Sequence, residues 1–581
     1  MAPAAEADSR VQFRRMLNNS SFRRFLVPCL AVALVAGLDA QPASKGGAAS
    51  IDADSLREWL GYIASDELQG RQIYTEGLGL AAAYIADHLR EWGVKPGGDG
   101  GSYFQTVRVV GVKTTSRASV TLEVNGRSRT FTDGDGVIFA RNMGGRQTIS
   151  TDRVEFVGYG LQIPSAEEDD YSGLDPKGRI IVWLGAQGPG AVGPQSRRLL
   201  TARSRLAVEK GALAVFAPVG GGAPARGGSR QGAAGPGQAA SQDFTTAQRY
   251  DRPVPPTVTA QDGFFEFLFS GSDIKYSALQ AAASKRQPLP RFTLANVKVT
   301  LNVDADYTVV STRLTRNVVG IVEGSDPGLK DTFVLIGAHY DHIGYSEAPS
   351  GSEGGPGGIP AAGCSGQTRD TPRADDTINN GADDDGSGTV SVMGVARAFA
   401  LGPRPKRSVM FMWHSGEESG LHGSRYMADH PVVPLDRIAA HLNIDMIGRN
   451  RCDQPSESNT VYLVGSDRIS TELHNVSDAT NRGLPAPLAL DYELNDPADP
   501  ESIYTRSDHF SYASRGIPII FYTTGLHRDY HYVTDEISKI EFGKMTRIAQ
   551  LVYETGFNVA NLDHFPVRDN KGPRAGSRPG Y

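Results

Sequence analysis

Apolar positions just after residue 50 recur at helical spacing. The pattern runs through "DADSLREWLGYIASDELQG" and "GLGLAAAYIADHLREWGVKP". Apolar residues three and four apart predict two amphipathic helices, and the second stretch stops at Gly-Val-Lys-Pro, which is typical of a helix end.

From about Val109 to Ile181 the pattern becomes that of strands. The segments rich in β-branched and aromatic residues are "SVTLEVNG", "RVEFVGYGLQI" and "RIIVWLG". A short helix and a strand are expected in "SRLAVEKGALAVFAPV", and more strands in "RFTLANVKVTLNV". Residues 218–242 are rich in Gly, Ala and Pro and hold few large apolar residues, so we expect a disordered surface loop there.

From about Thr315 onward, strongly apolar runs alternate with helical stretches. Each apolar run is followed by a polar loop that contains glycine: "NVVGIVEG", "TFVLIGAHYDH", "RSVMFMWHSGEE" and "AAHLNIDMIG". Strands that alternate with helices predict an α/β fold, here a mixed, mostly parallel sheet flanked by helices on both faces. In such sheets the functional residues lie at the carboxyl ends of the strands.

A chain of 581 residues is too long to fold around one hydrophobic core, so we expect several regions along it. We expect a signal peptide over 1–41, the first part of the main domain over 51–112, a β-rich insert over 113–306, the rest of the main domain over 307–562 and a disordered tail over 563–581.

The N-terminal region has the layout of a secretory signal. Arg23 and Arg24 precede an apolar run from Phe25 to Leu38, and small residues follow. Residues 1–15 would make the segment before the signal unusually long, so we expect translation to start at Met16. The run is shorter than the roughly 20 residues of a membrane span. Export to the periplasm or the medium is therefore predicted, with no stable membrane anchor after cleavage; a signal anchor is the alternative.

Composition narrows the choice of partners. The net charge is −6 and long basic runs are absent, which argues against nucleic acid or an anionic membrane as the main partner. Three cysteines exclude a disulfide scaffold. After signal cleavage Cys364 and Cys452 remain, either as one disulfide or as free thiols. The oligomeric state is left open.

Histidines and carboxylates gather in five motifs of the C-terminal half. They are "GAHYDH" (337–342), "GADDDGSG" (381–388), "HSGEESG" (414–420), "NIDMIG" (443–448) and "DYHYVTDE" (529–536). Taken singly, each has an ordinary reading as a turn, a helix cap or a loop residue. Five in one sheet indicate a metal site, because zinc binds histidine nitrogen and carboxylate oxygen.

The stock of ligands suits two ions. Two histidines and three carboxylates, one of them shared, match a two-metal site with ions about 3.5–4 Å apart. The sequence has no HExxH helix and no G-x-S-x-G elbow, which weakens the one-zinc protease and serine hydrolase interpretations.

In order and in strand context the five motifs resemble the dizinc peptidases of family M28, which include secreted bacterial aminopeptidases and glutamate carboxypeptidases. The resemblance covers the helices before residue 110 and about 310–560. The insert, with "FVGYGL", "DDYSGLDPKGRIIVW" and "KGALAVF", is similar to a protease-associated (PA) domain.

The resemblance implies two Zn²⁺ per chain and assigns roles by motif. It implies that His339 and Asp445 bind one ion, that Glu418 and His531 bind the other, and that Asp384 bridges them. It further implies that Glu417 is the general base, that Tyr530 stabilises the tetrahedral intermediate and that Asp341 fixes the tautomer of His339.

The implied function is that of a secreted zinc exopeptidase acting on peptides or proteins, most simply an aminopeptidase. A glutamate-carboxypeptidase-like enzyme is the alternative, with Arg425, Arg449 or Arg506 as the clamp for a free carboxylate. A catalytically inactive binding protein on the same fold is disfavoured because all five ligands and the base are present. Acids outnumber bases around the motifs and in residues 491–502, which favours a cationic substrate end, hence the amine.

Overall fold

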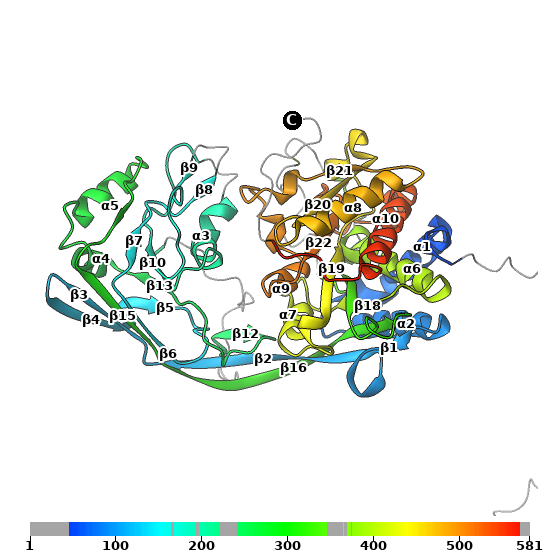
Figure 1. Ribbon diagram of the computed structural model, residues 1–581, viewed down its shortest axis with the longest axis horizontal. Coiled ribbons are helices and arrows are strands. Elements are labelled where there is room, and N and C mark those ends of the chain that lie inside the picture. The colour runs from blue at the N-terminus through cyan, green and yellow to red at the C-terminus, as the bar shows by residue number, and fades with distance from the viewer. Residues whose placement is uncertain are drawn as a thin grey trace, which may run out of the picture. The chain divides into compact units, whose positions relative to one another are not determined.

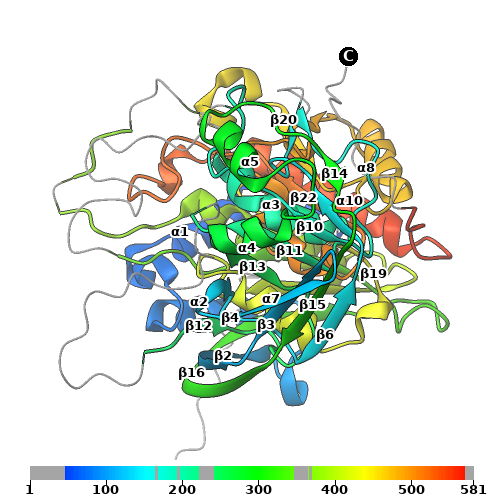
Figure 2. The ribbon, with the colours of Figure 1, turned by 90° about the vertical axis from the view of Figure 1, so that its left-hand side faces the viewer.

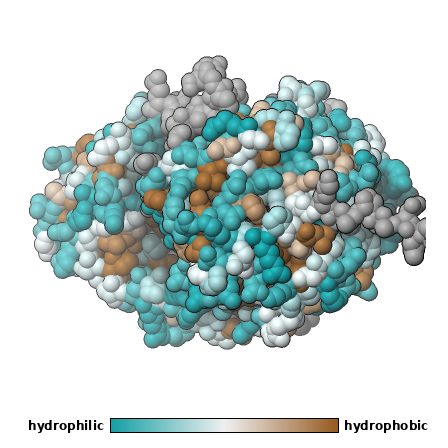
Figure 3. All heavy atoms as spheres, turned by 45° about the vertical axis from the view of Figure 1, so that its right-hand side comes forward, coloured by the Kyte–Doolittle hydropathy of each residue, from teal (hydrophilic) through white to brown (hydrophobic). Residues whose placement is uncertain are grey.

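The computed structural model describes residues 46–163, 168–192, 197–220, 241–345, 364, 369–373 and 375–569. The predicted signal peptide, the Met16 start, most of the predicted 218–242 loop and the tail beyond 569 lie outside this range. Within it, no helix combines the length and the apolar character that crossing a membrane requires. Polar residues dominate the face shown in Figure 3, where apolar residues form small groups.

The larger part of the fold is built on a sheet with parallel strands at its centre. The central strands, in spatial order, are β18 (Ser408–His414), β17 (Phe333–His339), β19 (Ile438–Ile444) and β22 (Ile519–Thr523), and all are parallel.

Antiparallel pairs extend the sheet on both sides. Beyond β18 follow β16 (Ala305–Val322), β2 (Phe104–Ser116) and β12 (Phe244–Thr246), with β1 (Lys95–Pro96) paired to β16; beyond β22 follow β20 (Thr460–Val464) and β21 (Ala489–Asp491). The β20–β21 pair is itself parallel. The predicted α/β fold with a mixed sheet is confirmed, and its parallel pairing is concentrated in the centre.

The central strands read as continuous apolar runs because helices cover both faces of the sheet. Along β17, Val334 and Ile336 enter the larger hydrophobic core, while Leu335 enters a smaller one on the opposite face. The larger core is covered by α1 (Ala53–Ile63), α2 (Glu76–Glu91), α6 (Gly388–Leu401), α8 (Thr471–Gly483) and α10 (Phe542–Ala560). On the other face lie α7 (His422–Asp429) and α9 (His509–Ala513) (Figure 1).

The two helices predicted at the start begin at capping residues. The Asp52 carboxylate accepts a hydrogen bond from the Ser55 backbone N–H at the start of α1, and the Thr75 hydroxyl accepts one from Leu78 at the start of α2. Such caps satisfy backbone donors that the first helical turn leaves without partners. Sequence and structure therefore agree on where these helices begin, to within a few residues.

Residues between β2 and β16 form a second mixed sheet with its own core. Its strands, in spatial order, are β14 (Phe292–Thr293), β7 (Val154–Phe156), β10 (Ile180–Val182), β11 (Ala214–Pro218), β13 (Thr257–Ala260), β5 (Gly136–Phe139), β4 (Arg127–Asp133), β3 (Ser119–Val124), β15 (Val297–Val303) and β6 (Gln147–Thr151). The short pair β8 (Gln162–Ile163) and β9 (Glu168–Asp169) stands apart. Figure 2 shows α4 (Asp262–Leu268) and α5 (Tyr276–Ser284) from this side. The helix α3 (Arg197–Glu209) packs Ala207 against Ile181 and Val215.

The long strands β2 and β16 connect the insert to the main sheet. They pair antiparallel from Ala305 opposite Ser116 to Val318 opposite Phe104, with a register shift between Val309 and Ser311. The boundaries that we placed at 112/113 and 306/307 therefore fall inside continuous strands. The insert is rich in strands, and its PA type stays a prediction.

Candidate metal centre and its pocket

The five motifs meet at one edge of the central strands. The predicted site residues lie at the end of β17 (His339), just after β18 (Glu417 and Glu418), just after β19 (Asp445), in the loop after β22 (Tyr530 and His531) and just before α6 (Asp384). Parallel strands end at a common edge, so residues far apart in the sequence converge there.

The turn that follows β18 requires a glycine. Gly416 has a φ of +75°. A Cβ at this position would lie 2.5 Å from Ile73 Cδ1, a contact that real side chains do not make. Glycine alone adopts this backbone conformation without strain, and the turn directs Glu417 and Glu418 to the strand edge.

Asp384 lies between two groups of potential ligands. Its Oδ1 atom is 3.3 Å from His339 Nε2, and Asp445 Oδ2 is 3.7 Å from the same nitrogen. Its Oδ2 atom is 3.1 Å from His531 Nε2, which in turn is 2.9 Å from Glu418 Oε2. The structure thus brings the five predicted ligands together, with Asp384 in the middle.

The chemistry of these atoms fits a pair of cations. Asp384 Oδ2 and His531 Nε2 are buried and lie 3.1 Å apart, yet within the described residues neither atom makes a hydrogen bond of acceptable geometry. Buried polar atoms without partners are costly. Two sets of donor atoms, each within 4.8 Å of one another, share Asp384: His339 with Asp445, and His342 with Glu418. Imidazole nitrogens and carboxylate oxygens in this arrangement are what zinc binds.

His342 is a site residue that the sequence interpretation did not name. It is the last residue of "GAHYDH", 1% exposed, and its Nδ1 atom is 2.8 Å from Glu418 Oε1 and 3.9 Å from Asp384 Oδ2. His342 and His531 therefore flank Glu418 on its two oxygens. Its presence in the motif was the available signal, but a second histidine in a loop has no spacing that marks it as a ligand or a partner.

Glu417 lies beside the cluster and faces the pocket. Its backbone N–H donates a hydrogen bond to Asp341 Oδ1 at 3.1 Å. Burial, together with the charges of Glu418 and Asp445, holds the pKa of Glu417 well above its ordinary value, against the lowering effect of His339. A carboxyl group whose pKa is shifted toward neutrality is suited to accept and return a proton.

Asp341 contacts His339 through its main chain. His339 Nδ1 is 3.0 Å from the backbone carbonyl oxygen of Asp341, and 3.8 Å from the nearer carboxylate oxygen. The backbone carbonyl is thus the closer acceptor for a proton on Nδ1, which leaves Nε2 free to face Asp384 and Asp445. The carboxylate instead holds the main chain at Glu417.

The neighbours of Asp384 in the triple-aspartate motif turn away from the cluster. Asp383 Oδ1 accepts hydrogen bonds from the Gly448 N–H and the Ser387 hydroxyl. Asp385 accepts from the backbone N–H groups of His339 and Met446. Both carboxylates therefore hold the loops of the site in place through hydrogen bonds.

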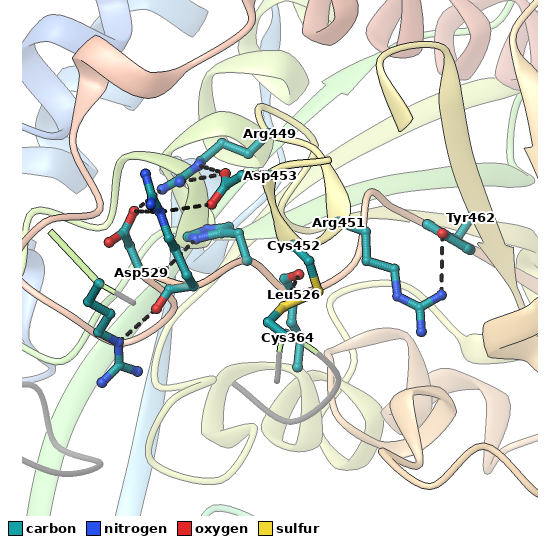
Figure 4. Close-up of a disulfide and its surroundings, with 11 residues drawn as sticks. Cys364, Arg449, Arg451, Cys452, Asp453, Tyr462, Leu526 and Asp529 are labelled. Carbon is teal, nitrogen blue, oxygen red and sulfur yellow. Dashed lines mark hydrogen bonds and ion pairs between the residues drawn. A yellow bond between two sulfur atoms is a disulfide. The ribbon is translucent and has the colours of Figure 1, made fainter. Parts of the chain in front are cut away.

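One pocket opens beside the cluster. Its lining is a set of site residues (His339, Asp384, Glu417, Asp445), a mainly apolar wall (Met446, Ile503, Ser507, Phe521, Thr523, Gly525, Leu526) and two residues with polar tips (Arg506, Tyr530). Of the three arginines considered as a carboxylate clamp, Arg506 alone belongs to this lining. Arg449 instead pairs with Asp453 at 2.6 Å and with Asp529 at 2.9 Å (Figure 4).

Residues 317–556 match the family model described as peptidase family M28. This region belongs to family M28. The match includes all five motifs of the candidate metal centre. It does not include the insert at 113–306.

Two curated relatives match part of the chain. Leucine aminopeptidase 2 of Trichophyton equinum is 25% identical over 307 residues, which are 48% of this chain and 53% of that protein. Leupeptin-inactivating enzyme 1 of Streptomyces exfoliatus is 31% identical over 148 residues, 25% of this chain and 30% of that protein. The chain spans about half the length of the first relative.

Solved structures show a distant likeness over most of the chain. An aminopeptidase from Aneurinibacillus sp. strain AM-1 is 17% identical with a TM-score of 0.41, covering 90% of this chain and 99% of that one. BSAP, a zinc aminopeptidase from Bacillus subtilis, is 16% identical with a TM-score of 0.39, covering 90% and 98%. Values this low say nothing about activity.

Most acids counted around the M28 motifs do not face the pocket. Asp383, Asp385, Asp508, Asp529 and Asp535 are all fully buried and absent from its lining. Asp529, for example, pairs with Lys539 at 2.8 Å, and Asp535 accepts from the backbone of Asp383 and Asp384. The excess of acids over bases counted along the sequence is therefore not an excess in the pocket. The carboxylates that line the pocket are those of Asp384, Asp445 and Glu417.

A disulfide holds the loop that forms one wall of the pocket. Cys364 and Cys452, which the sequence left open as a pair or as free thiols, are bonded. The backbone N–H of Cys452 donates to the carbonyl oxygen of Leu526 at 2.9 Å. Figure 4 shows the sulfur bridge next to Leu526, a residue of the pocket lining.

Proposed function

We propose that the protein is an exported, zinc-dependent aminopeptidase that releases N-terminal residues from peptides or proteins. The observation that carries this proposal is the convergence of the five predicted ligands around Asp384, with Glu417 beside them at a pocket. Membership of the region in family M28 supports it, as do relatives that are leucine aminopeptidases.

In this proposal His339 and Asp445 would hold one zinc ion, Glu418 and His531 would hold the second, and Asp384 would contribute to both. Zinc bound there supplies Lewis acidity toward a carbonyl oxygen and makes water more acidic. Glu417 accepts a proton from water in the pocket and passes it to the leaving amine. The hydroxyl of Tyr530 lines the same pocket and donates a hydrogen bond to the carbonyl oxygen as negative charge develops on it.

The pocket favours a free amine over a free carboxylate. Asp384, Glu417 and Asp445 place carboxylates at its base. The one arginine in its lining, Arg506, already donates hydrogen bonds to Glu501 Oε2 and to the Tyr530 hydroxyl, both at 3.1 Å. A clamp for a substrate carboxylate needs a cation whose donors are available. The aminopeptidase assignment is therefore preferred to the carboxypeptidase alternative.

The apolar part of the pocket points to the substrate side chain. Met446, Ile503, Phe521 and Leu526 give it an apolar wall. Burying an aliphatic side chain against such a wall is worth about 1.5–3 kcal/mol. We therefore infer that the released residue is apolar, as in a leucyl peptide.

The test compares substrates that differ at their ends. The purified protein should hydrolyse leucine p-nitroanilide, should not hydrolyse its N-acetylated form, and should leave an N-blocked dipeptide intact. Cleavage of the blocked dipeptide from its free C-terminus, without action on the free amine, would establish the carboxypeptidase alternative. A purified protein that neither binds zinc nor turns over any of the three would be the inactive binding protein.

A further inference from the structure

Glu501 is an acid beside the pocket that has no role in the proposed chemistry. Its side chain is 15% exposed, and its Oε2 atom is 3.1 Å from Nη1 of Arg506. The same oxygen is 3.0 Å from Nε of Arg198, in α3 of the insert. Arg506 lines the pocket, whereas Glu501 is not part of the lining. One carboxylate therefore lies behind the pocket wall and faces two guanidinium groups.

The loop itself fixes the position of this carboxylate. The backbone N–H of Glu501 donates to Asp499 Oδ1 at 3.1 Å, and that of Ile503 donates to Asp499 Oδ2 at 2.9 Å. Between them Ser502 has a left-handed backbone, with φ of 51°. Asp499 thus ties the loop on both sides of Glu501, so the acid is held in place by more than its attraction to Arg506.

Arg506 carries the one guanidinium group in the pocket lining. It shares the lining with Ile503, Phe521 and Leu526, and its Nη2 atom donates a hydrogen bond to the Tyr530 hydroxyl. A guanidinium without a counter-ion at such a wall would attract anionic groups and would disfavour apolar ones. The carboxylate of Glu501 balances that charge from behind.

We propose that Glu501 is a positioning residue that sets the specificity of the pocket. By engaging and neutralising Arg506, it makes the pocket accept apolar N-terminal side chains and disfavour acidic ones. This inference rests on the proposed aminopeptidase function. It means that Glu501, an acid outside the metal cluster, determines whether leucyl or glutamyl substrates are preferred.

The variant Glu501→Gln separates charge from shape. Glutamine keeps the size of the side chain and an oxygen that accepts from Arg506, but it removes the negative charge. The positive charge of Arg506 is then no longer balanced and attracts a substrate carboxylate, so the ratio of kcat/KM for glutamyl over leucyl p-nitroanilide should rise about tenfold or more. We expect the change mainly in KM for the glutamyl substrate.

Two further variants serve as controls. Arg198→Gln removes the other cation from Glu501 and leaves the Glu501–Arg506 pair, so it should not raise the ratio. The double variant Glu501→Gln with Arg506→Gln has no cation to expose, so its ratio should return to about that of the wild type. A purely structural role for Glu501 would lower both activities and leave the ratio unchanged.

The outcomes separate this inference from the function on which it rests. A wild-type protein inactive on both substrates overturns both. A wild-type protein active on the leucyl substrate, with a ratio in Glu501→Gln that stays within about twofold of the wild type, overturns the specificity role alone.

A variant that folds but does not turn over still permits the test. If Glu501→Gln hydrolyses neither substrate, calorimetry measures its affinity for L-glutamate relative to L-leucine. A relative affinity about tenfold or more above that of the wild type supports the specificity role, and one within about twofold of the wild type overturns it.

Discussion

At the scale of single residues, the adjacent acids Glu417 and Glu418 are predicted to have different roles. Glu418 binds metal, and Glu417 transfers a proton. Glu418 lies between His342 and His531, whereas Glu417 faces the pocket. Glu417→Gln should keep the zinc content and lower kcat by roughly 10²-fold or more, the loss expected when a general base is removed. Glu418→Gln should lose one zinc ion per chain. Metal analysis beside steady-state kinetics measures both, and equal metal loss in the two variants would contradict the division.

A second residue-scale prediction concerns pH and lies outside the metal centre. Burial, with the charges of Asp376, Asp66 and Asp535, raises the pKa of Glu536 from 4.5 to about 7. The folded protein therefore binds a proton that the unfolded chain releases, and this contribution to stability is present below pH 4.5 and lost as the pH rises through about 7.

Replacing Glu536 by Gln should remove this pH dependence. The Tm of Glu536→Gln minus the Tm of the wild type should grow between pH 4.5 and pH 7 and then level off. Thermal denaturation across that range measures it. Glu266→Gln, at an exposed position of the insert, is the matched control, and the same trend in both variants would contradict the assignment to Glu536.

At the scale of elements, the site depends on loops that follow rigid strands. The Cys364–Cys452 disulfide closes a sequence separation of 88 residues and adjoins the Leu526 wall. Removing a disulfide typically costs about 2–4 kcal/mol, in large part because the unfolded chain gains freedom.

The paired variant Cys364→Ser with Cys452→Ser should therefore have a lower Tm than the wild type. Treatment with a reductant should lower the Tm of the wild type toward that of the variant and should leave the variant unchanged. Thermal denaturation with and without reductant measures both effects. An equal response of the two proteins to the reductant would show that the bridge is not the source of the difference.

At the scale of the whole molecule, the metal centre should couple zinc binding to the stability of the fold. The proposed ligands come from segments between His339 and His531 that are far apart in the sequence, so the unfolded chain cannot present them together. A ligand that binds only the folded state stabilises it, by about 4 kcal/mol at a thousandfold excess over Kd.

Chelation should consequently lower the Tm, and added zinc should restore it. His339→Gln should respond less to the chelator than the wild type, because it has lost a ligand. His564→Gln is the control, since His564 pairs with Glu472 at the surface. A chelator that shifts the Tm of all three proteins equally would mean that the shift does not arise at this centre.

The sequence by itself determined the elements and the chemistry that they carry. The apolar runs ending at His339, His414 and Ile444 predicted strands because covered parallel strands are apolar on both faces. Parallel strands share an edge, so motifs at their ends converge whatever the details of packing. This is why the α/β fold and the convergence of the five motifs were accessible without a structure, whereas the resemblance to family M28 supplied the choice of individual ligands.

Only the tertiary structure decided which side chains surround that set. His342 beside Glu418, Glu501 behind Arg506 and the pairing of Cys364 with Cys452 each join residues from different loops. No periodicity records such contacts, because they depend on how loops pack after the strands have formed. The same holds for charge: Asp383 and Asp385 look like Asp384 in the sequence, yet backbone N–H groups take up their oxygens. The packing of distant segments distinguishes Asp384 from its two neighbours, and the local sequence pattern does not encode that packing.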